Sequence, residues 1–125
     1  GALIASRRFP AHARVRRKSE FDAVYRQGHR LSDSLFTLNY LPNTEGCPRL
    51  GLAIAARTAG IAVERNRIRR VIRESFRLAR PMLPPADIVI GARPAVRTAA
   101  NAALRNSLDA LWVRLGKACA PSSKA

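Results

Sequence analysis

The stretch from Val63 to Arg80, VERNRIRRVIRESFRLAR, places seven basic residues in eighteen positions. At about 100° per residue, its charged and apolar side chains separate onto two faces of a helix. One stripe contains Arg65, Arg69, Arg73 and Arg77, with Asn66, Arg70 and Arg80 beside it. The roughly opposite side carries Ile68, Val71, Ile72, Phe76 and Ala79. The pattern predicts one amphipathic helix with a core-facing side and a side that meets negative charge.

The signs of the charges on this helix favour a polyanion partner. An ordinary solvated helix mixes signs, because Glu and Arg four positions apart stabilise it and like charges at that spacing oppose it. Here only Glu64 and Glu74 dilute the arginines. An unpaired arginine stripe repels itself, and a nucleic acid would relieve that repulsion. A purely solvated face is the alternative interpretation.

Composition limits the classes of protein that fit. The chain has 125 residues, 47% of them hydrophobic, which suits a single domain with one modest core. A formal net charge of +15 indicates RNA, DNA or an anionic surface as partner. No apolar run approaches the roughly 20 residues of a membrane span, and Ala2–Ala5 is too short for a signal segment, so we expect a cytoplasmic protein without a membrane partner. Cys47 and Cys119 have no metal-binding spacing and are expected to be free.

The order of elements predicts three regions. Residues 1–18 form a basic, extended arm that is typical of nucleic-acid binding and contains Arg14, Arg16, Arg17 and Lys18. Residues 19–116 form a single domain, and residues 117–125 form a disordered tail. Ser19 and Asp22 resemble a capping box that starts a short helix ending at Gly28.

Three strands and a last helix follow from the apolar patterns. Residues 35–41 alternate as a half-buried strand, and residues 49–57 give a second strand that should pair with the first as an antiparallel hairpin. The small face of the second strand, which includes Gly51, suits close approach by a helix or by RNA backbone. Residues 58–62 link it to the basic helix. The apolar run 87–93 should lie inside the sheet, and residues 98–116 form a helix that Trp112 anchors in the core.

Local signatures of catalysis are absent from the sequence. The eight acidic residues are scattered, without the clustered carboxylates that a two-metal nuclease needs. His12 and His29 have no neighbouring nucleophile or carboxylate pattern, and no glycine-rich phosphate loop occurs. We therefore expect a protein that binds and does not itself cut, with no catalytic residue and no metal site of its own.

The segment RNRIRRVIRE at residues 65–74 resembles the signature RNRxKRxxRE of the protein subunit of bacterial ribonuclease P. The resemblance covers nearly the whole chain. In order, its blocks are SEFDAVYRQG, LFTLNY, PRLGLAIAAR, the signature, DIVIGAR and ALWVRL. The order and spacing of these blocks are more specific than an arginine-rich helix alone.

This resemblance implies a fold and a function. The fold would be an α/β (α+β) two-layer sandwich, with a mixed sheet of about four strands, three helices and a left-handed βαβ crossover. The protein would join a catalytic RNA that, with magnesium, removes the 5′ leader of precursor tRNA. It would need no cofactor of its own and no protein partner.

The resemblance also implies site residues. The catalytic RNA would meet Arg65, Asn66, Arg67, Arg69, Arg70, Arg73 and Arg77. The precursor-tRNA leader would lie in a cleft bordered by Phe21, Tyr25, Phe36 and Arg57. Ala56 stands where the family commonly has Lys, so one contact could be lost or supplied by another arginine. From the sequence alone, the aromatic side chains of the first helix could equally belong to the core.

Three other functions fit parts of the sequence. A structural, ribosomal-type RNA-binding protein would use the same basic helix without any role in cleavage. A nuclease acting without RNA is disfavoured by the scattered carboxylates. A DNA-binding helix is disfavoured because no helix-turn-helix or heptad pattern sets a dimer.

Overall fold

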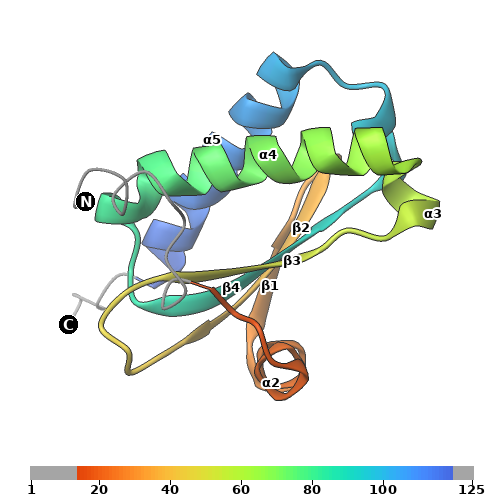
Figure 1. Ribbon diagram of the computed structural model, residues 1–125. Helices are drawn as coiled ribbons and strands as arrows, with labels where there is room; N and C mark the ends of the chain where they lie inside the picture. Colours follow the sequence, from red (N-terminus) through yellow and green to blue (C-terminus); the bar gives the residue numbers. More distant parts are fainter. Residues whose placement is uncertain (1–13, 120–125) are drawn as a thin grey trace, which may run out of the picture.

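A mixed four-stranded sheet forms the centre of the molecule in the computed structural model, which describes residues 14–119 (Figure 1). The strands are β1 (His29–Ser32), β2 (Phe36–Pro42), β3 (Arg49–Ala53) and β4 (Ala86–Ala92). Their order in the sheet is β1-β2-β4-β3. β2 is antiparallel to both β1 and β4, whereas β3 runs parallel to β4. β3 is therefore an edge strand.

Helices cover the two faces of this sheet unequally. The long helices α4 (Ala62–Ala79) and α5 (Asn101–Ala118) lie on one face, and α2 (Lys18–Gln27) lies on the other (Figure 1). Short segments α3 (Ala56–Ala59), η2 (Arg80–Met82) and η3 (Pro94–Arg97) connect them. The predicted α+β class, with three main helices and a four-stranded mixed sheet, is confirmed. β3, α4 and β4 form a βαβ unit, and its left-handed sense stays a prediction.

The main core lies between the sheet and the two long helices. Alternate residues of β2 and β4 face it, because successive strand side chains point to opposite faces. Its fully buried members are Phe36, Leu38, Ile88 and Ile90 from the sheet, Ile68, Ile72 and Phe76 from α4, and Leu104, Leu108, Leu111 and Leu115 from α5. Trp112 is 5% exposed and donates a 2.8 Å hydrogen bond from Nε1 to Ser75 Oγ. The predicted core role of Trp112 is confirmed.

The predicted hairpin between the first two apolar strands is wrong. β4 pairs with both β2 and β3 and separates them in the sheet. β4 is an uninterrupted apolar run, and Ala86 to Ile90 are all buried. A strand that is apolar on both faces is most stable where both faces and both edges are covered. The central position therefore belongs to β4, as its predicted place inside the sheet required.

Several element boundaries differ from the sequence-based expectations. β3 ends at Ala53, and residues 56–59 form α3 where a longer strand was expected. β1 was not predicted, because its four residues show only a short and mixed pattern. α5 continues to Ala118, two residues beyond the expected end of the domain. The basic helix spans nearly the predicted residues, and Gly60, at a φ of 93°, makes the turn before it.

Candidate nucleic-acid interface

The segment before α2 lies along the free edge of β3. Arg14 forms a parallel bridge with Leu50, and the Val15 N–H donates a 2.9 Å hydrogen bond to the Leu50 carbonyl. Gly51 makes this close approach possible, since a Cβ atom there would lie 2.8 Å from the Phe21 ring and 2.9 Å from Val15 Cβ. The small face of β3 is thus filled by α2 and the arm, the helix-packing alternative of the two considered.

A groove of about 660 Å³ opens between this arm, β3 and α4. Its lining combines guanidinium groups with a partly apolar surface. The residues are Arg14, Val15, Arg16, Phe21, Leu50, Gly51, Leu52, Arg69 and Arg73. Cationic groups beside an aromatic ring and a strand edge are the chemistry that holds a single nucleic-acid strand, through phosphate contacts and base stacking.

The positive charges around this groove are crowded. Partial burial, followed by the nearby guanidinium groups of Arg69 and Arg14, lowers the pKa of Arg73. The arginine keeps its charge at neutral pH, so the shift reports repulsion and desolvation and not loss of a proton. An anion between these groups would offset their repulsion, which makes the groove a favourable place for phosphate.

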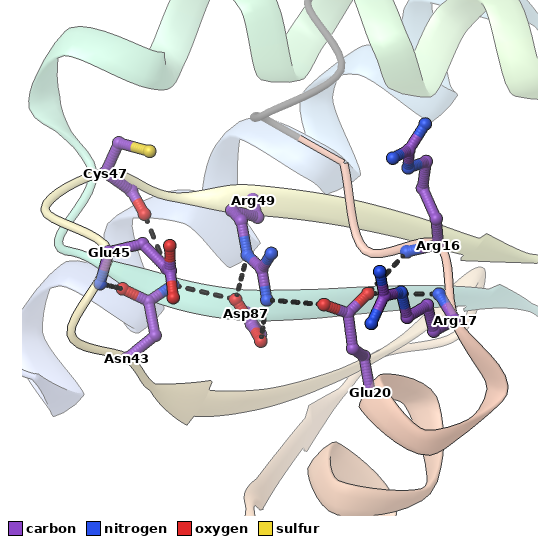
Figure 2. A network of polar contacts seen from close by, with 8 residues as sticks. All are labelled: Arg16, Arg17, Glu20, Asn43, Glu45, Cys47, Arg49 and Asp87. Atoms are coloured by element: carbon purple, nitrogen blue, oxygen red, sulfur yellow. Dashed lines mark hydrogen bonds and ion pairs between the residues drawn. The ribbon is translucent and has the colours of Figure 1, made fainter.

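A polar network fixes the wall of the groove that α2 provides (Figure 2). Arg49 donates from Nε and Nη2 to the two carboxylate oxygens of Asp87, each at 2.7 Å. The Nη2 of Arg49 also lies 3.2 Å from Glu20 Oε2, and Asn43 Nδ2 donates to Asp87 Oδ1 at 2.7 Å. The hydrogen bond to Asp87 raises the pKa of Arg49. One guanidinium thus joins β3, β4 and the first turn of α2.

Glu20 caps the start of α2, a role that the sequence had suggested for Ser19 and Asp22. Its Oε1 accepts hydrogen bonds from the backbone N–H of Arg16 at 2.9 Å and of Arg17 at 3.0 Å. The bond from Arg17, followed by that from Arg16, lowers the pKa of Glu20. The cap and the ion pair with Arg49 together tie the arm to the helix.

The lowered pKa of Glu20 predicts a pH dependence of stability. A carboxyl group whose pKa is lower in the folded than in the unfolded state stabilises the fold above its unfolded pKa, about 4.3 for Glu. That stabilisation is lost as the pH falls through the folded-state pKa. We expect Glu20→Gln to unfold at lower temperature than wild type at pH 6, with the difference shrinking toward pH 3. Thermal unfolding of both proteins across this range measures it. Glu45→Gln removes the same charge at an exposed site and serves as control, and a constant difference for Glu20→Gln would contradict the assignment.

The arginines predicted from the helix pattern have different environments. Arg69 and Arg73 reach the groove, whereas Asn66 and Arg70 are exposed on the outer surface of α4 and Arg65 is partly buried. Arg77 is paired with Glu74 within the helix. Arg67 is partly buried and bonds with Glu64 and Asn101. The helix therefore does not present one uniform arginine surface.

The residues predicted to border a leader cleft also lie in different parts of the structure. Phe21 lines the groove and Tyr25, one helical turn later, is 50% exposed. Phe36 has 0% exposure and belongs to the main core on the opposite side of the sheet, so its ring is not available to a surface ligand. The backbone of Arg57 lies in α3, and its side chain is outside the described part of the structure.

The remaining predicted residues lie in the arm. Arg14 and Arg16 line the groove, and Arg17 immediately precedes α2. Lys18 Nζ lies 3.0 Å from Asp22 Oδ2 in an exposed pair. Residues 1–13, including His12, lie outside the described part of the structure.

The ion pair between Arg49 and Asp87 was not predicted from the sequence. Opposite charges at the beginnings of two apolar strands are a signal that could have indicated it.

The described residues, 14–119, contain neither a metal-binding cluster nor a membrane-spanning helix. In that part of the chain, no cluster of three or more His, Cys, Asp or Glu side chains could hold a metal ion. Within the same residues, no helix is long and apolar enough to cross a lipid bilayer. Cys47 and Cys119 are free, as predicted. The basic groove is thus the feature of the described residues that most resembles a ligand site.

Comparison with known proteins assigns the chain to a family. The ribonuclease P family model matches residues 9–116, which include the whole sheet, α2, α4 and all but the last two residues of α5. The chain belongs to the ribonuclease P protein family. A ribonuclease P protein component from Thioalkalivibrio sulfidiphilus is 43% identical over 112 residues, covering 90% of this chain and 93% of that protein. The component from Halorhodospira halophila is 42% identical over 119 residues, and the alignment covers 94% of this chain and 98% of that protein.

Solved structures of the ribonuclease P protein have the same fold. The protein from Staphylococcus aureus superposes with a TM-score of 0.77 at 28% identity, covering 84% of this chain and 95% of that one. The Thermotoga maritima protein gives a TM-score of 0.74 at 26% identity, covering 81% and 96%. The chain is therefore a ribonuclease P protein component, a subunit of the endoribonuclease holoenzyme. The family places it in tRNA processing as part of a ribonucleoprotein.

Proposed function

We propose that this protein binds the catalytic RNA of ribonuclease P and the 5′ leader of precursor tRNA, and so assists removal of the leader. The observation that carries the proposal is the groove in which Arg14 and Arg16 of the arm meet Arg69 and Arg73 of α4. Family membership supports association with the catalytic RNA. The cleavage chemistry is assigned to that RNA with magnesium, and the protein contributes binding and charge.

The two RNAs are assigned to neighbouring surfaces. The exposed outer side of α4, with Asn66 and Arg70, faces the catalytic RNA together with the groove arginines Arg69 and Arg73. The leader follows the α2 side, where Phe21 and Tyr25 offer aromatic faces to unpaired bases. Arg57 stays a candidate from the resemblance alone. Phe36 and Arg67 are not included, because their side chains are used within the protein.

Electrostatics supplies the mechanism by which such a protein assists. A leader strand held beside a large folded RNA brings many phosphates together, and their repulsion opposes both folding and substrate binding. A chain with a formal net charge of +15 offsets this repulsion at close range, and it reduces the magnesium concentration that the RNA needs. Since phosphate contacts and stacking read position and shape, sequence specificity for the leader should be weak.

Cleavage of a precursor tRNA at low magnesium tests this function. Three reactions are compared: the protein alone, a bacterial ribonuclease P RNA alone, and the two together. We expect cleavage at the mature 5′ end in the mixture only, because the RNA needs the protein's charge when magnesium is scarce. A polycation such as polyarginine at equal charge is the control.

The control separates this function from the second candidate. If polyarginine stimulates cleavage as strongly as the protein, the structural RNA-binding interpretation without a role in cleavage replaces the proposal. If the protein cuts alone, the catalyst is not the RNA. Equal affinity of the holoenzyme for precursor and mature tRNA would remove the leader-binding part of the proposal.

A further inference from the structure

Arg67 is the second arginine of the segment Arg65-Asn66-Arg67. All three nitrogen atoms of its guanidinium group donate hydrogen bonds within the protein. Its Nη1 donates to Asn101 Oδ1 at 2.7 Å and to the Ala99 carbonyl at 3.3 Å. Its Nη2 donates to the Val96 carbonyl at 3.3 Å, and its Nε donates to Glu64 Oε1 at 3.1 Å. These bonds use most of the donors that a guanidinium offers. A bidentate phosphate contact would require some of them to break.

The bonds of Arg67 join the first half of α4 to a distant part of the chain. Val96 belongs to η3 and Asn101 is the first residue of α5, so the contacts span about thirty residues of sequence. Arg67 lies about 200° around the helix from Arg65 and also from Arg69. It therefore points away from the groove that Arg69 lines.

The first turn of α4 buries no side chain. Its N-cap residue Ile61 makes no side-chain capping bond, and Ile61 and Val63 are each 71% exposed. The first buried side chain of the helix is Ile68. Apolar packing thus fixes α4 from Ile68 onward, whereas the part before it is held by the polar contacts of Arg67 and by the neighbouring segment α3.

We infer that Arg67 is a positioning residue, which holds the N-terminal half of α4 against η3 and α5 and thereby aims the neighbouring arginines at RNA. The inference rests on the proposed RNA-binding role of α4. It gives Arg67 a different role from Arg69, Arg70 and Arg73, although all four belong to one sequence motif. A planar fork is needed for this role, because a lysine ammonium is a point charge that cannot reach Asn101 and two carbonyl groups together.

Replacement by lysine distinguishes positioning from phosphate contact. Binding to a bacterial ribonuclease P RNA is measured at several salt concentrations, well below the unfolding temperature of each variant. We expect Arg67→Lys and Arg67→Ala to weaken binding similarly, by about threefold to tenfold, since charge alone does not restore the fork. Arg70, at an exposed position of the same helix, is the contrasting site: Arg70→Lys should bind more tightly than Arg70→Ala, because lysine keeps the charge that a phosphate contact needs. Near wild-type binding by Arg67→Lys would overturn the inference.

Asn101→Ala provides a second, milder variant that leaves every charge in place. If Arg67 acts through Asn101, then Asn101→Ala also weakens RNA binding, and the double variant is no weaker than Arg67→Ala. The inference would be overturned if the two losses of affinity multiplied in the double variant, or if Asn101→Ala had no effect on RNA binding. Amide hydrogen exchange in residues 62–67 should be faster in both single variants and unchanged in Arg70→Ala. A different result would show that the proposed function itself is wrong. In that case Arg69→Ala and Arg70→Ala would leave RNA binding and its salt dependence unchanged.

Discussion

Replacing Asp87 with alanine is expected to lower the free energy of unfolding by about 3 kcal/mol. Asp87 accepts two hydrogen bonds from the Arg49 guanidinium group. The side chain of Asp87 is only 11% exposed and that of Arg49 only 15%. Alanine would leave the guanidinium mostly buried, with Glu20 as its remaining charged partner at 3.2 Å. Breaking a buried pair on one side costs more than the pair itself contributes, because the remaining charge stays desolvated.

Chemical denaturation of the variant and two controls measures this effect. Asp109→Ala removes an equal charge from an exposed position of α5 and should change stability by no more than about 0.5 kcal/mol. The double variant Arg49→Leu/Asp87→Leu should lose less than the sum of the single changes, since it leaves no unpaired charge. A loss for Asp87→Ala as small as that for Asp109→Ala would show that the pair carries little of the stability.

The Arg49–Asp87 pair also connects stability to the interface. Through Glu20 it fixes the first turn of α2, and α2 supplies Phe21 to the groove. The Glu20 carboxylate also accepts a hydrogen bond from the backbone N–H of Arg16, whose side chain lines the groove. Loss of Asp87 should therefore loosen the α2 wall while α4 keeps its own packing in the main core. The two walls of the groove depend on separate contacts.

The sequence predicted those parts of the fold that depend on local periodicity. The basic helix was found nearly at its observed ends, because its apolar residues recur with the helical period and pack on the sheet. The order of strands was not predictable in this way. A hairpin between β2 and β3 satisfies local turn chemistry, and only the packing of the whole domain gives β4 the position between them. β1, with four residues, is too short for a pattern.

The site was predictable in residue type and less so in geometry. The arm and the basic helix were both recognised as cationic, yet the groove exists because Arg14 and Val15 pair with the distant edge of β3. The family resemblance implied RNA contacts for Phe36 and Arg67, but Phe36 is buried in the core and Arg67 bonds with η3 and α5. A motif thus identifies candidates, but the neighbours of each side chain decide whether it is available to RNA.

The double variant Arg69→Ala/Arg73→Ala is expected to give the largest loss of RNA binding. Both side chains line the groove, and each phosphate contact contributes about 0.9 to the slope of log K against log salt concentration. We expect this slope to fall by nearly two units for ribonuclease P RNA. At 0.1 M salt, the affinity loss should be on the order of tenfold for each contact. Filter binding or fluorescence titration over a range of salt concentrations measures both quantities.

The matched control Arg105→Ala/Lys117→Ala also removes two positive charges, from exposed positions on α5 outside the groove. Long-range attraction alone would weaken binding equally in both variants, because net charge falls by the same amount. Direct phosphate contact lowers the salt slope only where the side chain meets the RNA. Equal slopes for the two double variants would mean that the groove is one part of a diffuse cationic surface. A difference of nearly two units would assign Arg69 and Arg73 to phosphate contacts.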